Sequence, residues 1–169
     1  IPKIIVVTST ISGEGKTFVA INLGGILALS NKKVLIIDTD LRRPKMSITF
    51  NNLNDFGLSN YLLGECNIEQ CIKGTEINNL FYFPAGSLPE YPNELLTSHK
   101  MDELLENLKK YYDIIILDTP PIGLISDTTK FVLLADTTVY VFRSEYSKKD
   151  FIYNLEKLKQ ELNPKELII

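Results

Sequence analysis

Short runs of consecutive apolar residues, separated by stretches of helical periodicity, constrain the fold of this chain more than any other feature of its sequence. Residues 4–7 read IIVV, residues 34–37 read VLII and residues 114–117 read IIIL. A strand has such an uninterrupted run when both of its faces are covered, as in a parallel sheet between layers of helices. Strands that alternate with helices form right-handed βαβ units. We therefore predict an α/β fold of three layers, a mainly parallel sheet with helices on both faces.

Weaker patterns place the other elements. We predict further strands at residues 80–83, 138–142 and 167–169, and helices at residues 17–30, 57–64, 93–110, from about 127 onward, and 148–162. The first of these helices is apolar almost all round, which predicts that it is buried. In residues 93–110 the apolar positions recur at helical spacing, which predicts a helix there. Ligands of such a sheet bind at the carboxyl ends of its strands.

Composition and charge exclude several classes of function. Hydrophobic residues make up 44% of the 169 residues and charged residues 23%, which is typical of a globular domain and not of a disordered or fibrous chain. The net charge of −3 gives no electrostatic basis for wrapping nucleic acid, so we predict no nucleic-acid partner. No apolar run approaches the roughly 18 residues of a membrane span, and no signal peptide opens the chain. Cys66 and Cys71 lack the spacing and the companions of a zinc site, so we predict free thiols in a cytoplasmic domain.

The segment after the first predicted strand carries a phosphate-binding motif. Residues 10–17 read TISGEGKT and match the P-loop pattern, except that Thr10 replaces its first glycine. Gly13 and Gly15 let the backbone curl so that successive N–H groups point at phosphate oxygens, and the following helix adds the partial positive charge of its N-terminus. The motif lies between a buried strand and a buried helix, which favours this interpretation over an exposed glycine turn. We predict an ATP site formed by Ser12, Gly13, Glu14, Gly15, Lys16, Thr17 and Phe18.

Three residues of that motif have more specific expectations. Lys16 is expected to reach the β- and γ-phosphates, and Thr17 to place its hydroxyl group on Mg²⁺. Glu14 is expected to lie exposed in the middle of the loop and to be structural.

Aspartates follow two of the buried strands directly. Asp38 and Asp40 come after the second strand, and Asp118 comes after residues 114–117. A carboxylate at the end of an apolar run is costly unless it meets a cation or hydrogen-bond donors, although a single one often just caps the next turn. Mg²⁺ takes one or two carboxylates and completes its coordination with phosphate and water. One carboxylate is therefore surplus, and it could act as a general base on a tyrosine hydroxyl group, whose ordinary pKa is about 10.

Residues 34–44, VLIIDTDLRRP, resemble the Walker A′ motif of the bacterial tyrosine kinases of capsular and exopolysaccharide systems. Further segments agree with that family in the same order, namely residues 57–59, 61–64, 85–87, 92–96 and 113–121, the last of which resembles its Walker B segment. The combination of D-x-D-x-R-R-P with a P-loop is specific, whereas the P-loop alone is not.

The resemblance implies an ATP-dependent protein-tyrosine kinase that autophosphorylates in trans and regulates polysaccharide polymerisation and export. It implies that Asp38 is the catalytic base, acting with Lys16 and Asp40. Thr17, Asp40 and Asp118 are expected to hold Mg²⁺. Arg42 is expected to help bind the nucleotide. Other roles left open for it are to steer an anionic acceptor, to contact a neighbouring subunit, or to be a solvated surface residue.

The resemblance also implies partners outside this sequence. In that family an assembly helix precedes the equivalent of residue 1, and a tyrosine-rich tail follows the equivalent of residue 169, so we expect residues 1–169 to be a single P-loop domain truncated at both ends. Expected partners are ATP and ADP, the membrane activator domain of a polysaccharide co-polymerase in the same or a separate chain, and further copies of the protein. These partners imply a location at the inner face of the cell membrane.

An alternative is a nucleotide-dependent switch or scaffold ATPase of the MinD and ParA type, which acts in cell division and chromosome partition. Those ATPases share the sheet, the P-loop and the acidic residues at the strand ends, but their P-loop has an additional lysine where Ile11 stands here. The kinases usually have proline where Ser12 stands, a difference that we expect to be tolerated. The isoleucine favours the kinase.

Overall fold

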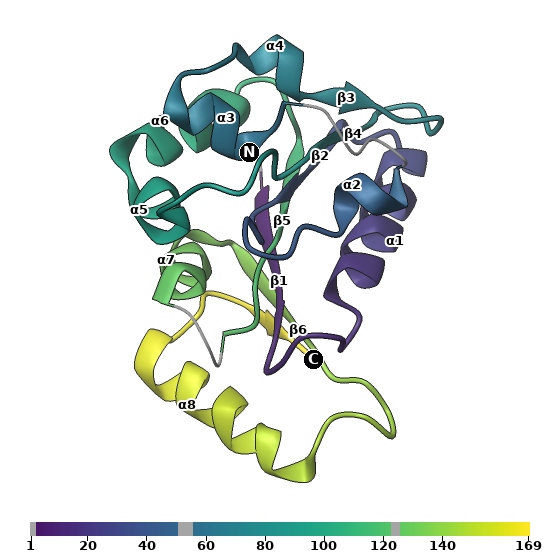
Figure 1. The fold of residues 1–169 in the computed structure, drawn as a ribbon. Coiled ribbons are helices and arrows are strands. Elements are labelled where there is room, and N and C mark those ends of the chain that lie inside the picture. Colours follow the sequence, from purple (N-terminus) through teal and green to yellow (C-terminus); the bar gives the residue numbers. More distant parts are fainter. Residues whose placement is uncertain (1–2, 51–55, 123–125) are drawn as a thin grey trace.

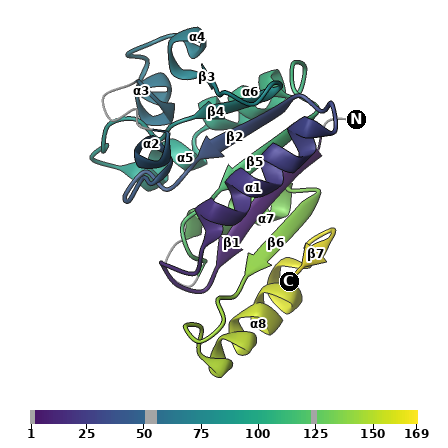
Figure 2. The same ribbon diagram turned by 90° about the vertical axis from the view of Figure 1, so that its right-hand side faces the viewer.

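A seven-stranded sheet forms the middle layer of the fold in the computed structural model, which describes residues 3–50, 56–122 and 126–169. Its strands are β1 (Lys3–Ser9), β2 (Val34–Asp38), β3 (Lys73–Gly74), β4 (Leu80–Phe83), β5 (Ile114–Asp118), β6 (Thr137–Val141) and β7 (Leu167–Ile168). Their order across the sheet is β3-β4-β2-β5-β1-β6-β7 (Figures 1 and 2, with β7 labelled in Figure 2). Every neighbouring pair is parallel except β3 with β4 at one edge, so the predicted mainly parallel sheet is confirmed.

Helices cover both faces of this sheet (Figures 1 and 2). They are α1 (Lys16–Leu29), α2 (Met46–Thr49), α3 (Leu58–Leu63), α4 (Ile68–Cys71), α5 (Pro92–Thr97), α6 (His99–Leu108), α7 (Ser126–Leu134) and α8 (Ile152–Leu162), the last preceded by the 3₁₀ turn η1 (Lys149–Phe151). Buried side chains of α1 and α2 pack on one face, and those of α3 to α8 pack on the other. The three predicted layers are therefore present.

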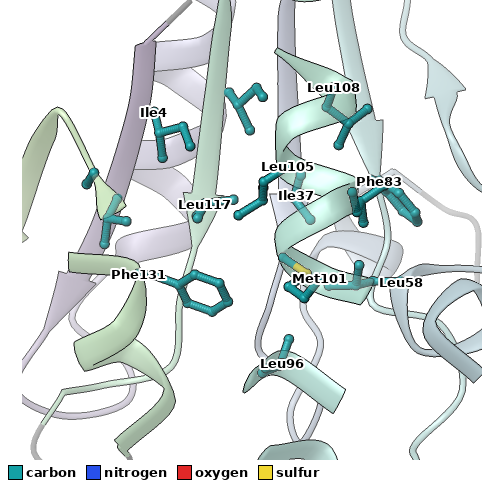
Figure 3. Close-up of a cluster of buried hydrophobic side chains, with 14 of the residues drawn as sticks. Ile4, Ile37, Leu58, Phe83, Leu96, Met101, Leu105, Leu108, Leu117 and Phe131 are labelled. Atoms are coloured by element: carbon teal, nitrogen blue, oxygen red, sulfur yellow. The ribbon is translucent and has the colours of Figure 1, made fainter. Parts of the chain in front are cut away.

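Alternate residues of each central strand enter the two different cores. Ile4 and Ile37 point toward the helices α3 to α8, whereas their neighbours Ile5 and Ile36 point toward α1. This alternation follows from the two-residue period of a strand, and it explains why the apolar runs have no polar gaps. Figure 3 shows the larger core, in which leucines of α5 and α6 and Phe131 of α7 close over the strands.

Helix α1 is only half buried, so the prediction of complete burial is wrong. Its sheet-facing side is built from small residues, and a Cβ on Gly24 would lie 2.8 Å from Cδ1 of Ile36. The backbone of α1 therefore approaches the sheet closely. Its outer side exposes Phe18, Ile26 and Leu29, which retain 72%, 64% and 76% of their accessible surface. Apolar periodicity alone cannot show which side of such a helix the sheet will cover.

The predicted helix over residues 93–110 is in fact two helices, α5 and α6, divided at Ser98. Ser98 has extended backbone angles, and its hydroxyl oxygen accepts a hydrogen bond from the backbone N–H of Met101 at 3.3 Å. Serine favours this N-cap geometry over a helix interior, because its side chain replaces a missing backbone partner. The break turns α6 so that Met101, Leu105 and Leu108 are buried.

The structure also bears on the cysteines and on membrane-spanning helices. Cys66 and Cys71 are free thiols, as predicted. Among residues 3–50, 56–122 and 126–169, no helix combines the length and the apolar character needed to cross a bilayer.

Candidate active site

The carboxyl ends of β1, β2 and β5 meet at one edge of the sheet and carry the predicted site. β5 lies between β2 and β1 and pairs with both, and its register with β2 places Asp38 opposite Asp118. The residues that line the resulting pocket are Gly13, Gly15, Lys16, Thr17, Phe18, Asp38, Asp40, Arg43, Lys45, Asp118 and Thr119. The fold therefore brings the P-loop and all three predicted carboxylates together.

The P-loop has the backbone geometry that its glycines predict. Gly13 and Gly15 both lie in the left-handed region, with φ of 90° and 98°. Residues with a side chain rarely adopt these angles, so glycine is needed at both positions. Helix α1 begins directly after the loop, at Lys16. Thr10, which replaces the first glycine of the motif, is buried, and its hydroxyl oxygen lies 2.8 Å from that of Tyr140.

Lys16 is buried inside the loop. Its Nζ donates a hydrogen bond to Oγ of Ser9 at 3.0 Å, and its side chain is 7% exposed. Burial lowers the pKa of this ammonium group, and the negative charge of Asp118 opposes that shift. The ammonium group is thus held between the P-loop and the carboxylates, where phosphate oxygens are expected.

Thr17 and Asp118 form a close pair. The Thr17 hydroxyl group donates to Oδ2 of Asp118 at 2.6 Å. Asp118 is 2% exposed, and its Oδ1 is buried without a hydrogen-bond partner among the residues that the structure describes. Burial raises the pKa of Asp118 to about 6, against the opposing effects of the Thr17 hydrogen bond and the Lys16 charge. A buried carboxylate oxygen without a donor is costly, so this pair fits a cation such as Mg²⁺.

Asp38 is buried and firmly oriented. Its Oδ1 accepts a hydrogen bond from the backbone N–H of Asp40 at 3.1 Å, and its Oδ2 accepts from those of Lys45 at 3.3 Å and Met46 at 3.2 Å. Burial, followed by repulsion from Asp118, nevertheless raises the pKa of Asp38 to about 8. A carboxyl group with such a pKa is a stronger proton acceptor than an ordinary aspartate when ionised.

Asp40 and Arg42 differ in how close they come to this centre. Asp40 lines the pocket, and its Oδ1 accepts from the backbone N–H of Arg43 at 3.1 Å. Burial raises the pKa of Asp40, while that hydrogen bond and the charge of Lys16 oppose the shift. The Arg42 guanidinium group donates to Oδ1 of Asn93 at the start of α5, and Arg42 does not line the pocket formed by the described residues.

Glu14 is buried, contrary to the expectation of an exposed loop residue. It is 2% exposed, and its Oε2 accepts from the backbone N–H of Ile11 at 2.8 Å. Its Oε1 accepts from the hydroxyl group of Ser147. The carboxylate is therefore satisfied inside the loop, and its side chain supports the P-loop conformation from within.

A segment that the sequence analysis did not single out braces the outside of the P-loop. Tyr146 donates its hydroxyl proton to the backbone oxygen of Ser12 at 3.1 Å, and Nη1 of Arg143 donates to that of Gly13 at 3.1 Å. Both residues follow β6, which pairs with β1. Local sequence carries no signal for this contact, because it depends on which strand lies beside β1.

Comparison with known proteins agrees with this geometry. A family model described as an AAA domain matches residues 2–168. Tyrosine-protein kinase CpsD of Streptococcus pneumoniae serotype 4 is 36% identical over 162 residues, which cover 95% of this chain and 70% of CpsD. The kinase domain of the Escherichia coli tyrosine kinase ETK superposes with a TM-score of 0.89 at 33% identity, covering 99% of this chain and 66% of that one.

The cell-division ATPase MinD of Pyrococcus furiosus is a more distant neighbour. Its TM-score is 0.79 at 27% identity, covering 98% of this chain and 70% of MinD. The matched residues span only 17% of the tyrosine-protein kinase wzc of Salmonella typhi, a much longer protein, and 53% of YwqD of Bacillus subtilis. CpsD is nevertheless matched over nearly the whole of this chain. The chain belongs to the bacterial tyrosine-protein kinase family, within the P-loop nucleotide-binding class.

Proposed function

We propose that this chain is the catalytic domain of a protein-tyrosine kinase that transfers the γ-phosphoryl group of ATP to tyrosine residues. The observation that carries the proposal is the separate placement of two buried carboxylates. Asp118 is paired with the Thr17 hydroxyl group and keeps one unpartnered oxygen, whereas Asp38 is held by three backbone N–H groups. One carboxylate thus suits a metal ion, and a second remains for proton transfer.

The nucleotide is bound by the P-loop in this proposal. The backbone N–H groups of residues 12–17 surround the phosphates, and Lys16 neutralises charge on the β- and γ-phosphates. Thr17 and Asp118 hold Mg²⁺, with Asp40 beside them in the same pocket. When bound there, Mg²⁺ would offset the negative charge of the phosphate groups. MinD of Pyrococcus horikoshii, a structural neighbour at 27% identity, is complexed with Mg-ADP, which supports the assignment of nucleotide and metal.

The transfer step uses Asp38 as the base. The acceptor oxygen of tyrosine forms a bond to the γ-phosphorus while the bond from that phosphorus to the bridging oxygen of the β-phosphate breaks. The bridging oxygen leaves with ADP, and the hydroxyl proton of tyrosine passes to Asp38. The pKa of Asp38, raised to about 8 by burial, lies close to neutral pH, where a general base is most effective.

A second part of this proposal concerns the activity of the full-length protein. We propose autophosphorylation in trans between copies of the protein, with activation by the membrane domain of a polysaccharide co-polymerase at the inner face of the membrane. The regulated process is the polymerisation and export of a capsular polysaccharide or exopolysaccharide. The support is the Walker A′ resemblance of residues 34–44, together with relatives that are named tyrosine-protein kinases.

The test is substitution of the proposed base. Asp38→Asn keeps the size of the side chain and is expected to retain Mg²⁺·ATP binding, measured by calorimetry. Phosphotyrosine formation on a supplied tyrosine-rich peptide should fall by about 10²-fold or more, because the proton acceptor is lost. The matched control is Asp150→Asn, which removes an exposed aspartate in η1 and should leave both properties unchanged.

The outcomes separate the kinase from the switch ATPase. Undiminished phosphotyrosine in the Asp38→Asn variant would show that Asp38 is not the base. If the unmodified protein hydrolyses ATP but produces no phosphotyrosine on peptides or on a tyrosine-bearing copy of the full-length protein, the kinase proposal is wrong. The MinD-type switch would then be the better description.

A further inference from the structure

Lys45 is a basic residue of the pocket to which neither the sequence motif nor the proposed mechanism gives a role. It lines the same pocket as Lys16, Thr17 and Asp118. It lies between Pro44, whose ring restricts the backbone, and Met46, which is fully buried. The backbone N–H groups of Lys45 and Met46 both donate to Oδ2 of Asp38. The base of the Lys45 side chain is therefore fixed relative to the proposed catalytic carboxylate.

The ammonium group of Lys45 is available to a ligand. Within residues 3–50, 56–122 and 126–169 it makes no hydrogen bond and no ion pair. A lysine on a flexible stem next to three carboxylates would ordinarily pair with one of them. Here Asp38 and Asp40 accept hydrogen bonds from backbone N–H groups and Oδ2 of Asp118 accepts one from Thr17, while Lys45 lines the pocket without pairing with any of the three.

Three basic residues follow Asp40, and they are not equivalent. Arg42 contacts Asn93 on α5, away from the P-loop. Arg43 lines the pocket, as Lys45 does. The charge of Lys45 acts on two groups of the pocket. Burial raises the pKa of Asp118, and the positive charge of Lys45 is one of the effects that oppose this rise. Burial lowers the pKa of Lys16, and the charge of Lys45 lowers it further. Of these three residues, Lys45 is therefore the one whose electrostatic reach covers both the metal-binding carboxylate and the P-loop lysine.

Phosphoryl transfer needs such a charge. In the transition state negative charge spreads over the three outer oxygens of the transferred group, and a fixed cation beside them lowers the barrier. Ile11 gives the P-loop no second cation. We infer that the Lys45 ammonium group contacts the γ-phosphoryl group of bound ATP and acts as a second catalytic cation opposite Lys16. The inference rests on the proposed use of ATP, but not on the identity of the acceptor.

The test compares Lys45→Gln, Lys45→Arg and a matched control, Lys32→Gln. Lys32 is exposed in the turn after α1, before the amino end of β2 and thus remote from the pocket. For Lys45→Gln we expect the kcat of phosphoryl transfer to fall by about 10²-fold, while the Kd of Mg²⁺·ATP changes by less than about 3-fold. Lys45→Arg should restore most of the rate, because it keeps the charge. Thermal unfolding of each variant verifies that it is folded.

A second measurement does not require turnover. ADP with Mg²⁺ and fluoroaluminate mimics the phosphoryl group in transfer, so its affinity should fall for Lys45→Gln in parallel with kcat, while the affinity for ADP alone stays constant. Unchanged kcat and unchanged fluoroaluminate affinity would overturn the inference, and so would a loss confined to ATP affinity. If the unmodified protein hydrolyses ATP without phosphorylating tyrosine, the kinase proposal fails, yet hydrolysis and fluoroaluminate binding still decide the role of Lys45.

Discussion

Asp38 should destabilise the nucleotide-free protein, and its replacement by asparagine should stabilise that form at neutral and alkaline pH. The side chain is 1% exposed, and its pKa is raised from an ordinary value of 3.8 to about 8, mainly by burial. The folded protein therefore binds the Asp38 proton more tightly than the unfolded chain does. The stability contributed by this group is complete below pH 3.8 and is lost as pH rises through 8.

The size of the effect follows from the two pKa values. Each unit of difference corresponds to about 1.4 kcal/mol, so Asp38 costs about 2 kcal/mol of unfolding free energy at pH 5 and about 5 kcal/mol at pH 8. Asparagine is neutral at both pH values. Its single carbonyl oxygen can keep the bonds from Lys45 and Met46 but loses the one from Asp40, which costs about 1–3 kcal/mol. The variant should thus be nearly as stable as the parent at pH 5 and more stable by about 2–4 kcal/mol at pH 8.

Thermal unfolding without nucleotide or Mg²⁺ tests this expectation. For a domain of this size about 1 kcal/mol shifts the Tm by 2–4 °C, so Asp38→Asn should melt about 5–15 °C higher at pH 8 and within a few degrees of the parent at pH 5. Asp150→Asn, which changes an exposed residue and keeps Asp38, should have the same Tm as the parent at each of the two pH values. A Tm difference that is independent of pH, or a less stable Asp38→Asn variant at pH 8, would refute the assignment of a buried, proton-binding Asp38.

Three further substitutions, one of them with a matched control, test the fold and the site. Gly57→Ala should destabilise the protein by more than about 3 kcal/mol in urea unfolding, because the new Cβ would lie 2.2 Å from a backbone nitrogen, whereas Gly74→Ala, with nothing within 4 Å, should be nearly neutral. Ser98→Ala should cost about 1 kcal/mol in the same assay through loss of the cap on the N–H of Met101, and an unchanged midpoint would contradict that role. Asp118→Asn should weaken the Mg²⁺ dependence of ATP binding by about 10-fold or more in calorimetric titrations, and equal Mg²⁺ dependence would show that the metal is held elsewhere.

The sequence by itself determined the architecture and most of the site. Apolar runs such as residues 34–37 identify strands covered on both faces, and the alternation with helices leaves a parallel sheet as the consistent fold. Gly13 and Gly15 carry their conformational requirement in their residue type. Asp38 and Asp118 come at the carboxyl ends of their strands, so parallel strands bring them to one edge without further information.

Local patterns also misplaced some features, for identifiable reasons. The helical spacing of apolar residues in 93–110 continues across Ser98, because the leucines of α5 and those of α6 pack into the same core. Only the cap geometry at Ser98 reveals the break between the two helices. The burial of α1 was overestimated since small residues, not the large ones, face the sheet. Phe18 and Leu29 therefore remain exposed although the helix reads as apolar throughout.

The tertiary structure alone decided how the P-loop is supported and which further residues surround it. Glu14 is buried because Ser147, more than a hundred residues later, lies in the segment after β6, and β6 is the neighbour of β1. Lys45 enters the pocket because the backbone after Asp40 turns back onto Asp38. Such contacts depend on strand order and chain reversal, which pair residues that no local period connects. Residue types thus set what chemistry the strand ends can carry, and the packing of the sheet sets which side chains share it.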